Sequence, residues 1–183
     1  MKNITDMQLI DYLLLDEKIG IILVGLPATG KSTIVDSIKK INNKFLISSN
    51  DNALEELAIE HGLNYNEAFK RFDVTKSVKE TFKQWVGAGE SIIVDKTNMS
   101  KKTRKLSIHP FICLGYRVIA INVICDEETR IKQDQMREMF TGKRIPPKVI
   151  DDMKRAYQEP EYNEGFENIY NIDSKFLKQY EQV

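Results

Sequence analysis

The sequence predicts an α/β protein in which a parallel sheet is flanked by helices, and two observations lead to this prediction. Short apolar runs rich in Ile and Val alternate along the chain with longer segments of helical periodicity, a pattern typical of βαβ units. The first of these runs, residues 19–24, leads directly into a glycine-rich loop and then into a helical pattern. Because ligands of parallel sheets bind at the carboxyl ends of the strands, we expect the site residues just after the apolar runs.

Five apolar runs are expected to form the strands. They cover residues 19–24, 44–47, 91–94, 117–124 and 169–172. Each run is short and dominated by β-branched or other large apolar residues, as expected for strands that are buried on both faces of a parallel sheet. The last run contains a polar residue and is the weakest of the five.

Helical segments precede, separate and follow these runs. They are expected at residues 5–15, from residue 31 onward, at 52–59, 66–86, 101–114 and 126–140, after Pro147, and at the C-terminus. The first helix begins near Thr5 or Asp6, either of which can cap a helix. Asn52 and Glu55 have the spacing of a capping box, and glycines follow the ends expected for the next two helices.

Composition indicates one globular domain. The chain has 183 residues, of which 42% are hydrophobic and 30% charged, and Lys plus Arg equals Asp plus Glu at 27 each, so no overall basic field indicates a nucleic-acid partner. Cys113 and Cys125 lie in apolar surroundings without metal-binding spacing and are expected to be reduced core residues. No signal sequence or membrane-spanning run is recognisable, so a cytoplasmic protein without membrane contact is expected.

The glycine-rich loop carries the strongest functional motif. Residues 25–32, GLPATGKS, match the pattern GxxxxGK[ST] between a strand and a helix, which is the context of a P-loop. Backbone N–H groups of such a loop face a polyphosphate, Lys31 approaches the β- and γ-phosphates, and the Ser32 hydroxyl suits Mg²⁺. We therefore expect ATP and Mg²⁺ as cofactors. The expected nucleotide-binding residues of the loop are Gly25, Ala28, Thr29, Gly30, Lys31, Ser32 and Thr33.

Two carboxylates follow neighbouring apolar runs. Asp51 comes shortly after the second run, where it could accept the proton of an attacking hydroxyl. It could instead cap the following helix, although Asn52 has the better capping spacing. Asp95 ends the third run as a Walker-B-type carboxylate does and is expected to hold Mg²⁺ with Ser32. Its alternative role is to cap the next turn.

Over residues 19–172, the chain resembles the 5′-kinase module of phage and bacterial polynucleotide kinases. The likeness lies in four ordered segments: the P-loop, Ser48-Ser49 with Asp51, Phe72-Asp73 with Lys76-Ser77, and Asp95-Lys96-Thr97-Asn98 with Arg104 downstream. The resemblance implies a P-loop kinase domain at residues 19–183, with a helical lid at about 126–147 and a helical extension at 1–18. It also implies that Asp51 is the general base and that lid arginines close over the nucleotide.

The P-loop and the acceptor side depart from the family pattern. Ala28-Thr29 stands where Gly-Ser is usual, a change that requires a negative φ at these residues. Leu54 stands where the family usually has an arginine for the acceptor phosphate.

The lid departs as well. The usual Arg-Asn pair aligns with Asp134-Gln135, which leaves Arg137, Lys143 and Arg144 as candidates for the charge on the γ-phosphate. We assign Arg137 to catalysis and Arg144 to nucleotide binding, with a solvated salt-bridge partner as the alternative for Arg137. Arg130 is expected to be an exposed salt-bridge partner.

These observations predict transfer of the γ-phosphate of ATP to the 5′-hydroxyl of DNA or RNA. A basic segment after the third run could line a nucleic-acid groove or be a solvated helix face; it comprises Lys96, Lys101, Lys102, Arg104 and Lys105. The alternatives are a kinase of a small hydroxylated metabolite, of the sugar-phosphate kinase type, and a kinase of hydroxymethylated bases in DNA. A nucleotide-dependent switch without transfer activity is a further alternative, which Asp51 argues against. The oligomeric state stays open.

Overall fold

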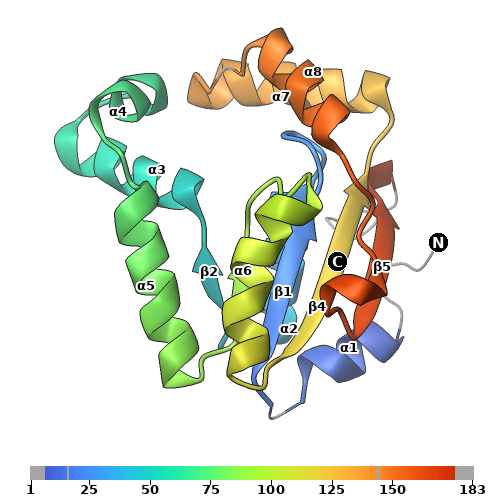
Figure 1. The fold of residues 1–183 in the computed structure, drawn as a ribbon. Coiled ribbons are helices and arrows are strands. Elements are labelled where there is room, and N and C mark those ends of the chain that lie inside the picture. Colours follow the sequence, from blue (N-terminus) through green and yellow to red (C-terminus); the bar gives the residue numbers. More distant parts are fainter. Residues whose placement is uncertain (1–6, 16, 144, 176–183) are drawn as a thin grey trace.

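The protein is a five-stranded parallel sheet with helices on both faces, as predicted (Figure 1). The computed structural model describes residues 7–15, 17–143 and 145–175. The strands are β1 (Ile19–Val24), β2 (Leu46–Ser48), β3 (Ile92–Val94), β4 (Arg117–Ile124) and β5 (Asn168–Asp173). Their order across the sheet is β2-β3-β1-β4-β5, and every neighbouring pair is parallel. The P-loop strand β1 is therefore central, and β2 forms one edge.

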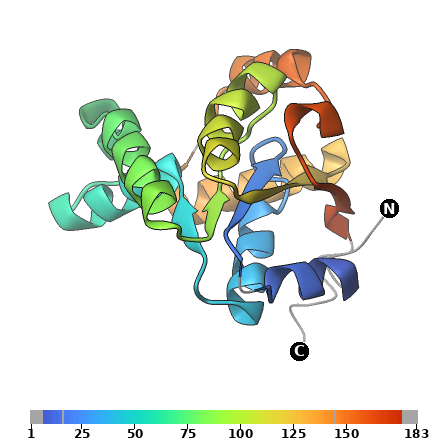
Figure 2. The same ribbon diagram turned by 60° about the horizontal axis from the view of Figure 1, so that its bottom comes forward.

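Helices cover both faces of the sheet (Figures 1 and 2). They are α1 (Met7–Leu13), α2 (Lys31–Ile41), α3 (Asn50–His61), α4 (Tyr65–Arg71), α5 (Thr75–Ala88), α6 (Lys101–Cys113), α7 (Glu127–Thr141), α8 (Pro147–Ala156) and the 3₁₀ turn η1 (Tyr162–Glu164). Helices α4, α7 and α8 lie beyond the carboxyl ends of the strands (Figures 1 and 2). Helices α1 and α2 pack on one face, where Leu9 and Ile34 join the core. Helices α5 and α6 pack on the other face through Phe82 and Phe111.

Strand β1 shows why this sequence forms a double-sided sheet. All six of its residues are buried, because both faces are covered by helices. Gly20 gives the closest approach: a Cβ there would lie 2.7 Å from the Phe111 ring. Helix α1 contributes Leu9, Tyr12 and Leu13 to the same core cluster as β1, so the division of the chain at residue 18 stays a prediction.

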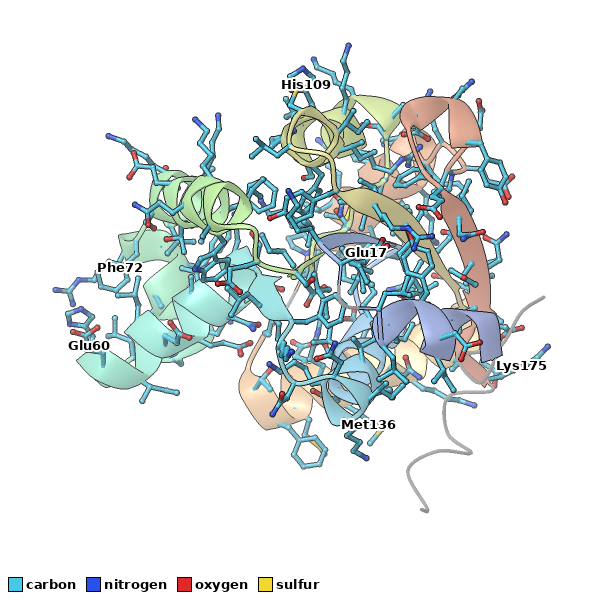
Figure 3. All side chains as sticks on the ribbon, turned by 90° about the horizontal axis from the view of Figure 1, so that it is seen from below. Glu17, Glu60, Phe72, His109, Met136 and Lys175 are labelled. Carbon is cyan, nitrogen blue, oxygen red and sulfur yellow. The ribbon has the colours of Figure 1, made fainter. Side chains whose placement is uncertain are left out.

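The single helix expected at residues 66–86 is two helices, and this is the main error in the prediction of the elements. Helix α4 starts with a capping box between Asn64 and Glu67 and ends at Phe72, whose backbone is extended. The Asp73 carboxylate then accepts a hydrogen bond of 2.9 Å from the Thr75 amide and starts α5. No Gly or Pro marks this break in the sequence, so helical periodicity alone did not reveal it. Figure 3 shows Phe72 and Glu60 at the outer side of this helical unit, away from the sheet.

Other differences concern helix starts and two side chains. The cap of α3 is Ser49, whose hydroxyl accepts from the Asn52 amide, so the capping box expected at Asn52 and Glu55 is wrong. Cys113 is exposed rather than buried, and Cys125 is only half-buried, because Cys113 lies on the outer face of α6. Among the described residues, no helix has the length and apolar character needed to cross a membrane.

Candidate active site

Glycines shape the P-loop at two points. Gly25 has a φ of +149°, and a Cβ at this residue would lie 2.8 Å from the Val123 carbonyl oxygen. Gly30, with a φ of +93°, directly precedes α2. The Gly25 amide donates to the Thr97 carbonyl at 3.0 Å, which ties the loop to the segment after β3. The N–H groups at the start of α2 therefore face a site for an anion.

Ala28 is strained in this loop. Its φ is +60°, so the negative φ that would let Ala replace Gly here without strain is not observed. The left-handed conformation costs an L-residue about 1–2 kcal/mol. The neighbouring Thr29 is buried and donates from Oγ1 to the Leu26 carbonyl at 2.9 Å, which helps to hold the loop in this shape.

The Lys31 ammonium is folded back onto its own loop. Its Nζ donates to the carbonyl oxygens of Gly25 (3.0 Å) and Leu26 (2.7 Å). Burial lowers the pKa of Lys31 to about 8, although Asp95 and Asp51 favour the charged form. Phosphate oxygens would replace two neutral carbonyl partners with stronger, charge-assisted hydrogen bonds.

A cavity of about 410 Å³ brings the predicted residues together. Its walls come from the P-loop, the start of α3, the end of β3 and the lid, which here denotes α7 and the residues up to Ile145. The lining includes Ala28, Gly30, Lys31, Ser32, Asp51, Glu55, Asp95, Arg137, Thr141 and Lys143. The volume is within the range of small-molecule sites. Of the predicted residues, Gly25 and Thr29 lie in the wall of a neighbouring cavity, and Thr33 lines neither of the two. Arg144 lies outside the described residues.

Asp51 has two partners in this cavity. Its Oδ1 accepts a hydrogen bond of 2.7 Å from the Tyr65 hydroxyl, and its Oδ2 lies 2.5 Å from the Lys143 ammonium. Burial raises the pKa of Asp51, but the Lys143 charge and the two hydrogen bonds outweigh it, so the pKa lies below the usual value. Since Ser49 caps α3, the carboxylate is not used as the cap. It is ionised and stands at the edge of the phosphate site.

The sequence analysis missed Tyr65 as a site residue. It is the first residue of α4, and the Lys143 ammonium lies 4.3 Å from the centre of its ring. The capping box at Asn64 could have placed Tyr65 at a helix start. Nothing local in the sequence connects that helix start with Asp51, because the contact depends on how α4 turns back over α3.

Asp95 lies beside the P-loop lysine at the end of β3. Its amide donates to the Ser48 carbonyl at 3.0 Å, so the ends of β2 and β3 are adjacent. Burial raises the pKa of Asp95, and the nearby Lys31 charge partly opposes this. The next helix is capped by Ser100, so Asp95 is not a helix cap, and its alternative role in the turn directly after β3 stays a prediction.

The oxygen donors in this cavity suit Mg²⁺. The Ser32 hydroxyl and the Asp95 carboxylate line the same cavity from two sides, and Mg²⁺ prefers such oxygen ligands together with phosphate oxygens and water. The residues present therefore fit the expected ion.

The two lid arginines differ in their surroundings. Arg137 lines the cavity and pairs with Asp134, and its buried Nε has no hydrogen-bond partner in the described part of the chain. The guanidinium thus lines the cavity while it is paired with an acidic residue of its own helix. Arg130 is buried and paired with Glu127 at 2.8 Å. The expectation of an exposed residue is wrong because packing of α7 on α8 covers the side chain.

Two of the five basic residues after β3 are paired with glutamates. Arg104 is fully buried, lies 2.7 Å from Glu164, and donates to the Asn98 carbonyl at 3.0 Å. It supports the fold and cannot contact a substrate. Lys101 pairs with Glu161 at 2.5 Å. Exposed lysines of α6 remain at Lys102 and Lys105, so the predicted patch is smaller than expected.

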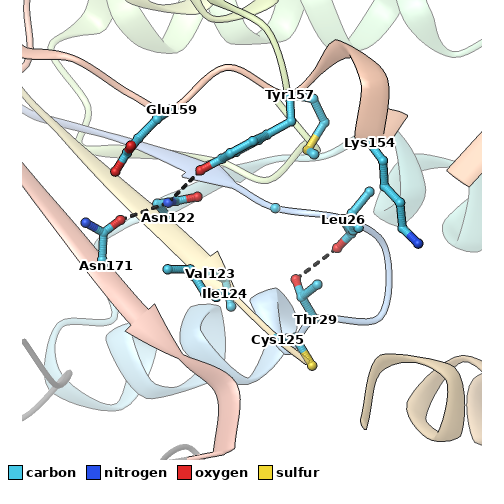
Figure 4. Close-up of a pocket in the computed structure, with 12 residues that line it drawn as sticks. Leu26, Thr29, Asn122, Val123, Ile124, Cys125, Lys154, Tyr157, Glu159 and Asn171 are labelled. Atoms are coloured by element: carbon cyan, nitrogen blue, oxygen red, sulfur yellow. Dashed lines mark hydrogen bonds between the residues drawn. The ribbon is translucent and has the colours of Figure 1, made fainter. Parts of the chain in front are cut away.

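A second cavity, of about 490 Å³, borders the P-loop at Gly25 and Leu26 (Figure 4). Its polar centre is the Asn122 amide, which donates to the Tyr157 hydroxyl (3.0 Å) and the Asn171 side-chain oxygen (2.8 Å). Most of the remaining wall is apolar. The sequence analysis did not identify this cavity, because its lining comes from five separate segments of the chain.

Comparisons with known proteins identify the family of the chain. A family model described as an AAA domain (AAA_33) matches residues 21–160. The chain is 24% identical over 167 residues to a bifunctional polynucleotide phosphatase/kinase of Schizosaccharomyces pombe. That match covers 89% of this chain and 35% of the relative, so the chain spans about a third of the relative's length.

Solved structures share the fold. A protein of Chloroflexus aurantiacus described as a candidate kinase has a TM-score of 0.65 at 17% identity, with 91% of this chain and 90% of that chain covered. A fungal RNA kinase has a TM-score of 0.56 at 14% identity, with 85% and 75% covered. A sugar kinase of Janibacter sp. has a TM-score of 0.55 at 17% identity, with 87% and 86% covered. Identities this low establish the fold alone.

Proposed function

Because the chain belongs to the AAA domain family AAA_33, matched over residues 21–160, we propose that it is an ATP-dependent kinase that phosphorylates the 5′-hydroxyl of DNA or RNA. The observation that carries the proposal is that Asp51, Lys31 and Ser32 line the same cavity. A switch protein needs the two P-loop residues but has no use for an ionised carboxylate beside the phosphates. A kinase needs such a group to take the proton of the attacking hydroxyl.

The residues of the cavity divide the work of the reaction. The Asp51 carboxylate accepts the proton of the acceptor hydroxyl. Lys31 and Arg137 stabilise the negative charge that develops on the transferred group. Ser32 and Asp95 would hold Mg²⁺, which supplies further positive charge to the phosphates when bound. The cavity beside Leu26 and Tyr157 has the apolar walls and amide groups that suit the base of ATP.

The nucleic-acid acceptor is supported by two lines of reasoning. The polynucleotide phosphatase/kinase of S. pombe and the fungal RNA kinase are similar to this chain, and their names describe phosphorylation of nucleic acids. In addition, Lys102 and Lys105 are exposed on α6, which begins six residues after Asp95. A phosphodiester backbone leaving the site would meet these charges.

A small-metabolite kinase is the second candidate, and the environment of Leu54 favours it. Leu54 is buried against Val74 and Val78 between α3 and α5, so a cationic group for an acceptor phosphate is missing at this position. Burial of Arg104 removes another positive charge from the surface. An uncharged acceptor such as a sugar would need neither group. A kinase of hydroxymethylated bases would use the same ATP-binding residues, and the assay below tests it together with the small-metabolite kinase.

Transfer of labelled phosphate from ATP tests these candidates directly. The acceptors are single-stranded and duplex DNA and RNA with a 5′-hydroxyl, the same strands with a 5′-phosphate, duplex DNA containing hydroxymethylated bases, free nucleosides and sugars. We expect label only on strands with a 5′-hydroxyl. Label on a sugar or nucleoside in preference to every strand would establish the second candidate instead, and ATP hydrolysis without transfer to any acceptor would overturn the kinase proposal.

A further inference from the structure

Two aromatic side chains of α4, Tyr65 and Phe69, lie near the proposed general base Asp51. The Tyr65 hydroxyl donates to Asp51, and the Phe69 ring lies one helical turn further along α4, with its centre 6.4 Å from that of Tyr65 and the ring planes 22° apart. The Lys143 ammonium makes a cation–π contact with the Tyr65 ring, 4.3 Å from its centre. Phe69 is 65% exposed, so most of its side chain is accessible to a ligand.

Phe69 also lies on the helix that contacts the lid. The neighbouring Asn66 donates from its side-chain amide to the Gly142 carbonyl at the end of α7, at 2.5 Å. At 100° per residue, Tyr65, Phe69 and Asn66 occupy one 100° arc of the helix, with Phe69 in the middle. The exposed ring is therefore on the same face of α4 as the residue that contacts Asp51 and the residue that contacts the lid, one turn further along the helix.

We propose that Phe69 is a stacking platform for the base of the acceptor's 5′-terminal nucleotide. The inference rests on the proposed function and deepens it. The acceptor hydroxyl must reach Asp51, and in a nucleotide the base lies one sugar ring from the 5′-oxygen. When the 5′-hydroxyl is at Asp51, a base that extends toward Tyr65 would stack on Phe69, because the Lys143 ammonium already covers the Tyr65 ring.

Two positions of the acceptor side supply no charge to the terminal nucleotide. Leu54 is apolar and buried, and Arg104 is buried and paired with Glu164. Stacking on an aromatic ring contributes affinity without requiring charge, and it tolerates any base because every base has a π-face. The platform thus predicts a preference for acceptors that carry a base, with little preference for which base.

Transfer kinetics with two acceptors test the platform. One is a single-stranded oligonucleotide with a 5′-hydroxyl, and the other is the same strand with an abasic 5′-terminal nucleotide. We expect Phe69→Ala to raise the KM for the intact strand about tenfold and to leave the KM for ATP unchanged. The abasic strand should show the raised KM with the wild type already and no further increase with Phe69→Ala. Phe69→Trp should retain the preference for the intact strand.

Tyr162→Ala is the matched control, because Tyr162 is 64% exposed and lies on η1, away from the cavity. It should change neither KM. An unchanged KM for the intact strand in Phe69→Ala, or an equal increase for both strands, would overturn the platform while leaving the proposed function in place. A wild type that transfers phosphate to no oligonucleotide would overturn the proposed function, and the platform with it.

Discussion

The two halves of the cavity are assembled in different ways. On the ATP side, the principal groups belong to one loop of eight residues, 25–32, and Lys31 even takes its hydrogen-bond partners from that loop. On the acceptor side, Asp51, Tyr65 and Lys143 come from α3, α4 and the lid. Phosphate binding is thus encoded locally, whereas the environment of the general base depends on how three elements pack together.

The ionised groups follow the same division. Lys31 loses solvent through the folding of its own loop, and its pKa falls to about 8. Asp51 keeps a low pKa against its burial because Lys143 from the lid and Tyr65 from α4 reach it. Variants of the ATP side should therefore act on the chemistry whatever the acceptor is. Variants of the acceptor side should act according to the acceptor and the pH.

The largest effect is expected from Lys31→Met. It removes charge stabilisation of the transferred phosphate and should lower kcat by about 10²-fold or more in the transfer assay. Lys40→Met, on the exposed side of α2, is the control and should keep kcat near that of the wild type. Near-normal turnover of Lys31→Met would contradict the assignment of the loop.

The same variant has a testable effect on stability. Burial lowers the pKa of Lys31 from 10.5 to about 8, so between these pH values the unfolded chain binds a proton that the folded chain does not. The free energy of unfolding of the wild type should then rise with pH across this window relative to Lys31→Met. Denaturant titrations at several pH values measure the difference. A flat difference would mean that Lys31 is better solvated than the structure indicates.

Asp51→Asn tests the acceptor side of the cavity. The amide keeps the shape but cannot take the proton, so kcat should fall by roughly 10²-fold while the KM for ATP changes little. Glu60→Gln, near the end of the same helix and exposed, serves as the control. Loss of ATP binding with normal turnover per bound ATP would make Asp51 a structural or metal-binding residue.

Lys143→Met should have a smaller effect that depends on pH. Without the lysine charge, the pKa of Asp51 rises, so the acid side of the profile of kcat/KM should move to higher pH. At neutral pH the loss should be about fivefold or less, as expected for an ion pair with a partly exposed partner. Tyr65→Phe removes one hydrogen bond to Asp51 and should shift the profile in the same direction. If neither variant moves the profile, Asp51 is not the group that titrates.

The smallest effect is expected from Lys102→Ser combined with Lys105→Ser. Removal of two phosphate contacts should raise the KM for an oligonucleotide a few-fold and reduce the slope of log K against log salt by about 1.4 for a single strand. Lys101→Ser should add little, because Lys101 is paired with Glu161. The control pair Lys40→Ser and Lys44→Ser lies at the opposite end of the sheet. An unchanged salt slope would mean that the α6 lysines are only a solvated helix face.

Prediction from sequence succeeded where one element decides the structure. The strands and the P-loop were located to within one or two residues, because apolar runs and the GxxxxGK[ST] pattern reflect local geometry. It failed at the break between α4 and α5, where an Asx turn at Asp73 interrupts a continuous helical pattern. It also failed at Ala28, whose positive φ is imposed by the loop around it.

The charged residues show the limit most clearly. Arg104 and Arg130 were expected to be solvent-exposed or facing substrate, and both are buried in ion pairs. Their acidic partners differ greatly in distance along the chain: Glu127 is three residues from Arg130, whereas Glu164 is 60 residues from Arg104. A sequence pattern can identify a nearby partner as a possibility, but burial depends on which helix packs above it.

The sequence by itself determined the fold class, the phosphate-binding loop and the two carboxylates at the strand ends, because these follow from periodicity, glycine placement and the parallel order of strands. Only the tertiary structure decided that Tyr65 and Lys143 meet at Asp51, that Arg104 is withdrawn from the surface, and that Phe69 stands exposed beside the site. Each of these depends on contacts between elements far apart in the chain, whose distances and burial are set by packing and have no local signature in the sequence.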